Sequence, residues 1–129
     1  RVTHAGTFNG NPMTSAAGRA TLELLTPEAF ARLGELGAQV RAGLAEAARG
    51  LPLQVTGAGS LFKVTALGRG VRDYRDAAAS DKRWESLCSL ALANEGFVLT
   101  PGLSGCVSTV TTRAEADALV SAFRDIVRS

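Results

Sequence analysis

The segment TPEAFARLGELGAQVRAGLAEAARG, residues 26–50, carries the longest unbroken helical pattern of the chain. Thr26 and Pro27 form a start signal, because threonine can cap free backbone N–H groups and proline suits the first helical position. Gly50 ends the pattern. The apolar side chains recur every three or four residues, as on one face of an α-helix: Phe30, Leu33, Leu36, Val40, Leu44 and Ala47. We expect one long amphipathic helix over about 27–49.

Two β-prone segments follow this helix, at 53–56 and 61–67, with Gly57-Ala58-Gly59 between them. In the second, apolar and polar residues alternate, which is typical of a strand with one buried face. Residues 68–79 are rich in Arg and Asp without a clear period, so we expect a surface loop there.

Ser80 is expected to open a third helix, which Gly96 ends. Its expected buried face consists of Trp84, Leu87, Cys88, Ala91 and Leu92. Strands are predicted at 97–100 and 106–110. The last helix begins at a capping box of Thr112 and Glu115, and its expected core face consists of Ala116, Leu119, Val120, Phe123 and Val127.

Upstream of the long helix, Asn11 and Pro12 begin another helix over 13–25. Its alanines, with Gly18 among them, favour a helix that packs closely against another backbone. The whole order of elements predicts an α+β domain, in which helices cover one side of a small, mainly antiparallel sheet.

Composition narrows the class of protein. The chain has 129 residues, of which 46% are hydrophobic and 20% charged, as expected of one globular domain. Its net charge of +2 is spread without a basic run, which argues against a nucleic-acid partner, and no apolar stretch is long enough for a membrane span. Cys88 and Cys106 are interpreted as two small buried residues of a reduced, cytoplasmic protein. We expect no metal site.

The segment HAGTFNGNP, residues 4–12, is the first candidate for chemistry. Glycines and small polar residues before a helix can leave backbone N–H groups free for an anion. An ordinary capped loop has the same pattern. His4 is the only histidine, and we interpret it as a polar residue of a connecting segment rather than as a proton carrier.

The run G-T-F-x-G-N-P at 6–12, followed by an alanine-rich helix, resembles the segment after the cofactor lysine in class III pyridoxal-phosphate-dependent aminotransferases. Residues 57–62, GAGSLF, are similar to a turn and strand of the glutamate-1-semialdehyde aminomutase branch. The H-A-G-T-F and T-P-E-A motifs resemble those of β-amino-acid transaminases in that branch. The resemblance covers nearly the whole chain.

This resemblance implies the C-terminal part of a fold-type I enzyme, with 1–26 as cofactor-phosphate loop and interdomain helix, and 27–129 as small domain. Such enzymes are homodimers whose large domain holds a Schiff-base lysine, which is expected upstream of Arg1. The lysines of this chain, Lys63 and Lys82, lie outside the family's lysine motif and are expected to be solvated. The chain therefore has no expected catalytic residue and is expected to be inactive alone.

The resemblance also implies three cofactor-binding residues. Thr7 matches the family threonine that reaches the pyridoxal phosphate of the neighbouring subunit through its hydroxyl and backbone N–H. Gly6 allows close backbone approach beside it, and Phe8 packs at the subunit boundary. The rest of the cofactor contacts are expected in the missing large domain.

The implied function is transfer of an amino group between an amino acid and a keto acid. Glutamate-1-semialdehyde 2,1-aminomutase is the alternative, although residues 100–105 carry no charge and 108–112 lack the histidine found in relatives of that type. A stand-alone α+β binding or regulatory module and an oligomerisation piece also stay open. The amino donor and acceptor are not defined by this sequence.

Overall fold

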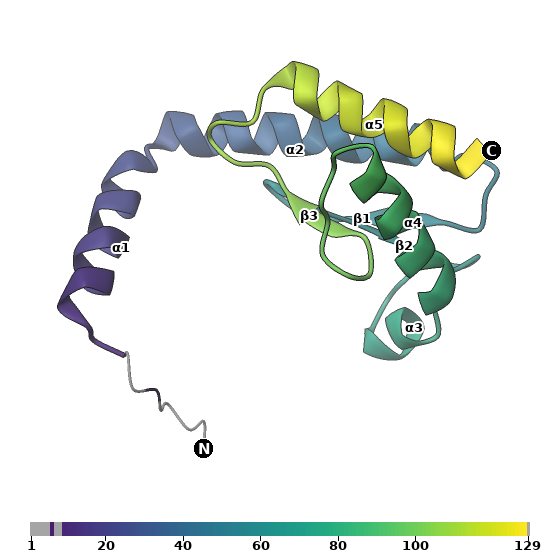
Figure 1. Cartoon of the computed structure of the whole chain (residues 1–129), viewed down its shortest axis with the longest axis horizontal. Helices are drawn as coiled ribbons and strands as arrows, with labels where there is room; N and C mark the ends of the chain where they lie inside the picture. Colours follow the sequence, from purple (N-terminus) through teal and green to yellow (C-terminus); the bar gives the residue numbers. More distant parts are fainter. Residues whose placement is uncertain (1–5, 7–8, 129) are drawn as a thin grey trace.

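The structure, a computed structural model, describes Gly6 and residues 9–128. Within this part of the chain, three short strands form one antiparallel sheet in the order β1-β2-β3, with helices packed on it (Figure 1). This arrangement confirms the α+β class. The elements are, in chain order, α1 (Pro12–Leu24), α2 (Pro27–Ala47), β1 (Gln54–Thr56), β2 (Leu61–Thr65), α3 (Tyr74–Ala78), α4 (Lys82–Asn94), β3 (Ser104–Cys106) and α5 (Arg113–Arg128).

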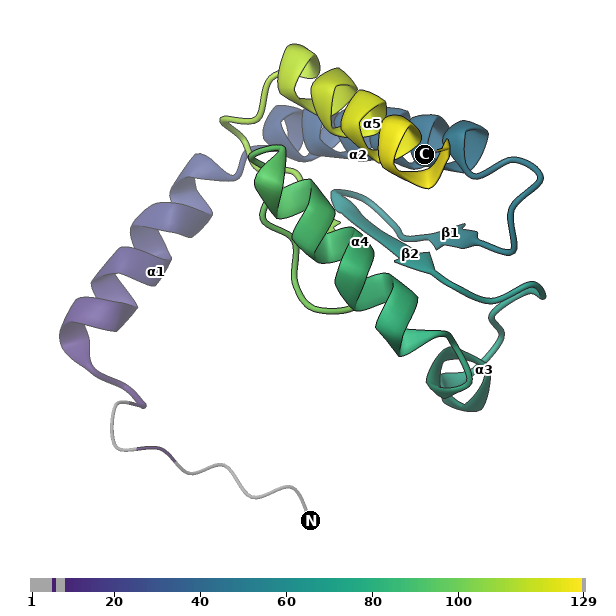
Figure 2. The same ribbon diagram turned by 45° about the vertical axis from the view of Figure 1, so that its right-hand side comes forward.

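Helices α2 and α5 lie side by side along the sheet, as both ribbon views show (Figures 1 and 2). The expected apolar face of α2 is buried from Leu36 to Ala47, whereas Phe30 is 59% exposed because it lies beyond the sheet near the start of the helix. In α5, Ala116, Leu119, Val120 and Phe123 are buried as predicted. Together these faces supply much of the apolar core.

The predicted capping box begins α5. The backbone N–H of Thr112 donates to the Glu115 carboxylate over 2.7 Å, and the backbone N–H of Glu115 donates to the Thr112 hydroxyl oxygen over 3.2 Å. The first of these bonds lowers the pKa of Glu115, because it stabilises the charged form. The sequence signal for this helix start is therefore confirmed.

Helix α4 differs from its prediction at both its start and its face. Asp81, not Ser80, caps it, because the Asp81 side chain accepts from the Trp84 N–H over 2.9 Å. Leu87 is 58% exposed rather than buried. Along with Cys88 and Leu92, the charged residue Glu85 is buried, although it was not part of the expected buried face.

The strand predictions at 97–100 and 106–110 are wrong, since the described residues 97–110 form one short strand, β3 at Ser104–Cys106, and an isolated bridge at Thr100. Gly102 and Leu103 both have positive φ, 89° and 56°, and this turn brings the chain back so that Thr100 bridges to Ser104. Residue 103 carries a side chain in the left-handed region, which usually disfavours non-glycine residues. Full burial of the Leu103 side chain compensates for that cost.

The segment predicted as loop at 68–79 contains α3. Asp73 caps it by accepting from the N–H groups of Arg75 and Asp76. Helix α3 is only five residues long, which is too short for an apolar period to be recognised in the sequence.

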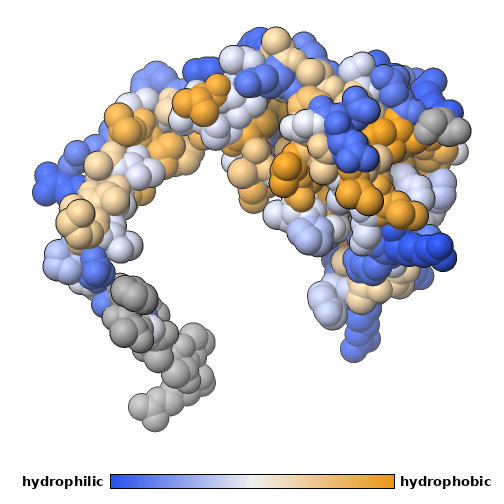
Figure 3. All heavy atoms as spheres, in the orientation of Figure 1, coloured by the Kyte–Doolittle hydropathy of each residue, from blue (hydrophilic) through white to orange (hydrophobic). Residues whose placement is uncertain are grey.

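Helix α1 forms where expected but has no buried residue. It extends away from the rest of the described chain (Figure 1), and its large apolar side chains, Met13, Leu22 and Leu24, are between 72% and 79% exposed. The space-filling view shows apolar side chains along this exposed helix (Figure 3). The expected close packing of α1 therefore has no partner within the described residues.

Candidate functional site

The predicted phosphate loop lies directly before α1. Its described residues are exposed, and they form a turn in which the Asn9 N–H donates to the Gly6 carbonyl over 3.1 Å, with Gly10 at φ 73°. Thr7, Phe8 and His4 lie outside the described residues. Of the three predicted cofactor-binding residues, Gly6 alone is thus placed, and it sits on an open turn.

The first turn of α1 offers no free backbone donor to an anion. Asn11 accepts from the Met13 and Thr14 N–H groups over 2.9 and 3.3 Å, and its carbonyl accepts from the Ser15 N–H over 2.9 Å. Pro12 has no N–H. Contact with a phosphate would therefore come from the loop before Asn11 rather than from the helix end.

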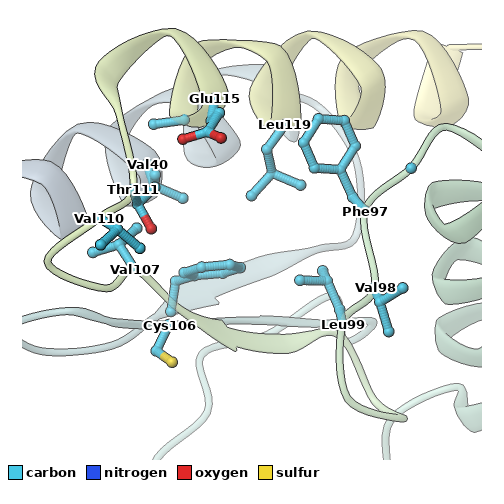
Figure 4. A pocket seen from close by; sticks show the side chains of 13 residues that line it. Val40, Phe97, Val98, Leu99, Cys106, Val107, Val110, Thr111, Glu115 and Leu119 are labelled. Atoms are coloured by element: carbon cyan, nitrogen blue, oxygen red, sulfur yellow. The ribbon is translucent and has the colours of Figure 1, made fainter.

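A pocket of about 340 Å³ opens between α2, α5 and the chain around β3 (Figure 4). Val40, Phe62, Leu99, Val107 and Leu119 make most of its wall apolar. Its carboxylate, Glu115, already accepts from the Thr112 backbone and has a lowered pKa, so it is a poor proton carrier near neutrality. The pocket suits an apolar group and has no evident acid–base pair.

The two thiols have opposite environments. Cys88 is 3% exposed, and burial raises its pKa to about 11, whereas Cys106 is exposed on the edge strand β3. The interpretation of both as buried residues is wrong for Cys106. Cys106 is the last residue of β3, at the border of the sheet, which leaves its side chain exposed.

We expect Cys106 to react with a thiol reagent such as Ellman's reagent in the folded chain at pH 8, while Cys88 reacts only on unfolding. A pKa raised from 9.0 to about 11 lowers the thiolate fraction of Cys88 by about 100-fold, and burial slows its reaction further. Counting released thiolate before and after adding urea checks this. Reaction of both thiols at similar rates in the folded chain would contradict it.

Lys63 is half-buried in β2 and is less solvated than expected, whereas the Lys82 side chain is 56% exposed, as expected. Lys82 donates to the carboxylate of buried Glu85 over 3.2 Å and to the Ala77 carbonyl over 3.1 Å. Sequence reasoning missed this pair, although Lys82 and Glu85 have the i, i+3 spacing of neighbours on a helix.

Neither a metal cluster nor a membrane helix is found in the part of the chain that the structure describes. No three His, Cys, Asp or Glu side chains among those residues are arranged to hold a metal ion. Among the same residues, every helix is too short or too polar to cross a membrane.

No protein-family model matches the chain. The chain is 39% identical to a β-phenylalanine transaminase from Variovorax paradoxus over 98% of its own length and 30% of that protein's, and its fold matches the crystal structure of that aminotransferase with a TM-score of 0.86. It is 44% identical to a glutamate-1-semialdehyde 2,1-aminomutase from Opitutus terrae, over 78% of this chain and 24% of the relative.

A third similar protein is a glutamate-1-semialdehyde aminomutase from Pseudomonas aeruginosa PAO1, solved in complex with PMP. It is 27% identical with a TM-score of 0.86, and the match covers 99% of this chain and 30% of that one. The chain thus spans about 30% of the length of the relatives that it matches over nearly all of its own length. By sequence and by fold, the chain belongs to the class III pyridoxal-phosphate-dependent aminotransferases, of fold type I, and corresponds to a C-terminal portion of such a protein.

Proposed function

We propose that this chain serves as the C-terminal portion of an aminotransferase that moves an amino group between an amino acid and a keto acid. The observation that carries the proposal is the 39% identity to the β-phenylalanine transaminase, which extends over 98% of the chain. A stand-alone module that reached this fold by convergence would not be expected to share sequence over that whole length.

Pyridoxal phosphate is the cofactor of this proposal, and when bound it supplies the electron sink for amino transfer. The described residues of the loop before α1, Gly6, Asn9 and Gly10, are exposed, and Asn11 occupies the first donors of α1, so the loop rather than the helix would reach the cofactor. Thr7, with Gly6 and Phe8 beside it, would contribute one hydroxyl and one amide to the phosphate of the neighbouring subunit. The remaining contacts belong to a large domain outside this chain.

The proposal assigns no amino-transfer step to this chain alone. Lys82 is paired with Glu85, and Lys63 lies half-buried in a strand, so neither is placed as a free amine beside the loop before α1. In this proposal, the residues of this chain form the small domain, α1 packs against the large domain, and Thr7 contacts the cofactor bound by the partner subunit of a homodimer. We expect no transaminase activity from the isolated chain.

Between the two branches, we favour the transaminase over the 2,1-aminomutase. Both kinds occur among the relatives, and among those matched over nearly the whole chain the identity is 39% for the Variovorax transaminase and 27% for the Pseudomonas aminomutase. The uncharged 100–105 turn and the absence of histidine at 108–112 support the same choice.

The two free thiols fit a cytoplasmic location, where disulfides are rare.

A chimera tests the proposed function. This chain would replace the matching 30% of the Variovorax transaminase, with transfer of the amino group from β-phenylalanine as the readout. We expect an active chimera whose affinity for pyridoxal phosphate falls about tenfold on Thr7→Ala, because a hydrogen bond to a charged group contributes about 1.5–3 kcal/mol. Thr14→Ala, on the exposed side of α1, is the matched control and should leave the affinity unchanged.

Three results would count against the proposal. A folded chimera that binds pyridoxal phosphate but transfers no amino group would contradict the assigned activity. Equal effects of Thr7→Ala and Thr14→Ala would remove Thr7 from the cofactor site. Turnover by the isolated chain would show that its own lysines are sufficient.

A further inference from the structure

The segment between Ala66 and Trp84 lies outside the apolar core that holds the rest of the domain together. The apolar core passes from Val64 and Ala66 directly to Trp84 and Cys88, and no apolar residue from 67–83 belongs to it or packs against it. Yet this segment contains a helix, α3, and a buried carboxylate, Asp76, which is 4% exposed. Polar contacts must therefore supply most of the interactions that hold this segment in place.

Asp76 is the centre of the first set of contacts. Its two carboxylate oxygens face the guanidinium groups of Arg69, at 2.9 Å, and Arg72, at 3.3 Å. The same carboxylate accepts from the Arg72 backbone N–H over 3.1 Å. These bonds tie α3 to the chain that precedes it.

Lys82 and Glu85 form the second set. From α4, the Lys82 ammonium group bridges the last turn of α3, at the Ala77 carbonyl, and the buried carboxylate of Glu85. Glu85 also accepts from the Ala66 backbone N–H over 3.1 Å, and the Asp81 N–H donates to the Ala66 carbonyl over 3.0 Å. Ala66 and Asp81 are thereby clamped together as the base of the segment.

Two glycines stand at the start of the segment, outside the apolar core. A Cβ at Gly70 would meet no atom within 4 Å, and one at Gly68 would meet only the Pro52 side chain, so neither position is tightly packed. Gly68 and Asp81, which flank residues 69–80, both line an apolar pocket of about 200 Å³, whereas 69–80 do not.

We infer that residues 68–80 form a flap, latched by Asp76 and Lys82, that opens while the core stays folded. Local opening is expected where few apolar contacts hold a segment, because such regions have a lower free energy of opening than the core. The clamp between Ala66 and Asp81 stays closed and keeps the opening local.

Charge sets the conditions under which the flap is closed. Asp76 is faced by Arg69 and Arg72 from the preceding loop, with Asp73 and Arg75 beside it and Lys82 reaching the end of α3 from α4. The backbone bond from Arg72, above all, lowers the pKa of Asp76 below 3.8. Because the pKa of Asp76 is lower in the folded state than in the unfolded state, its ionised carboxylate stabilises the closed flap fully at pH values well above 3.8. This stabilisation is lost as the pH falls through the lowered pKa. The latch is therefore closed at neutral pH, where salt rather than acid should weaken it, because its arginines are exposed.

Hydrogen exchange of the chain tests the flap, with exchange rates corrected for the intrinsic effect of each condition. At pH 7 and low salt, amides of 68–80 should exchange with a lower free energy of opening than those of α2 and α5. Asp76→Asn should speed exchange in the flap about tenfold, since it removes a charge-assisted bond, and change that of α2 and α5 less than twofold. Asp125→Asn, an exposed change of the same charge on α5, is the matched control and should leave the flap unaffected.

Two further measurements keep the test decisive if Asp76→Asn folds poorly. Wild-type chain in 0.5 M NaCl should show faster exchange in the flap alone, and the double variant Arg69→Gln, Arg72→Gln should behave as Asp76→Asn does. Trypsin should also cut the wild-type chain after Arg72 and Arg75 sooner in 0.5 M NaCl. The inference would be overturned if the flap amides exchanged together with the core in every case. It would also be overturned if the salt effect were spread evenly over the chain.

Discussion

Replacing Phe123 by alanine is expected to lower the free energy of unfolding by about 3–5 kcal/mol, the range for removing a buried aromatic side chain. Phe123 is 1% exposed and belongs to the face of α5 that packs on the core. Domains of this size are stable by only about 5–15 kcal/mol. The variant should therefore unfold at a much lower urea concentration, which circular dichroism at 222 nm would measure.

Phe30→Ala is the matched control, because it makes the same chemical change at a side chain that is 59% exposed on α2. Its effect on the urea midpoint should be small, since little apolar area returns to water. An equal loss of stability in the two variants would mean that Phe30 is buried in solution, against a partner or another copy. It would also contradict the placement of α1 and the start of α2 outside the core.

The helices of this fold were predictable because their signals are local and redundant. α2 has a proline start and a 3.6-residue apolar period over 21 residues, and α5 has a reciprocal capping box. The hairpin of β1 and β2 followed from alternation around a glycine turn. In these elements, propensity, capping and burial all favour one structure.

The remaining elements depend on contacts that a local pattern cannot reveal. β3 is three residues long, and its position follows from the turn at Gly102 and Leu103, where a non-glycine residue takes a positive φ. Glu85 and Asp76 are buried with arginine or lysine cations from nearby in the sequence, and Glu85 also needs the backbone N–H of the distant Ala66. A sequence period assigns such charges to the surface, so both were missed.

The candidate cofactor site was found by resemblance rather than by physical pattern. Glycines before a capped helix suggested an anion, but Asn11 takes up the helix donors that this argument relied on. The identification of Thr7 depends on the match to the family motif and stays a prediction. The family assignment itself is confirmed by the relatives.

Gly37→Ala should be strongly destabilising, by about 3 kcal/mol, at the upper end of what overpacking costs. A Cβ added at Gly37 would lie 2.1 Å from the carbonyl oxygen of Gly59, which also accepts from Arg41 over 2.7 Å. The contact is between two backbones, so a side-chain rotation cannot relieve it. The methyl group would push α2 away from the turn that joins β1 and β2, and urea unfolding would register the loss.

Gly34→Ala makes the same change one helical turn earlier in α2, where an added Cβ meets no atom within 4 Å. It should raise the free energy of unfolding by about 0.5–1 kcal/mol, because alanine is the better helix former. The two variants thus have opposite expected signs, and helix propensity alone predicts a gain for both. Stabilisation by Gly37→Ala would show that α2 does not approach the Gly57-Ala58-Gly59 turn as closely as the structure has it, since the close contact with that backbone is what reverses the expected sign.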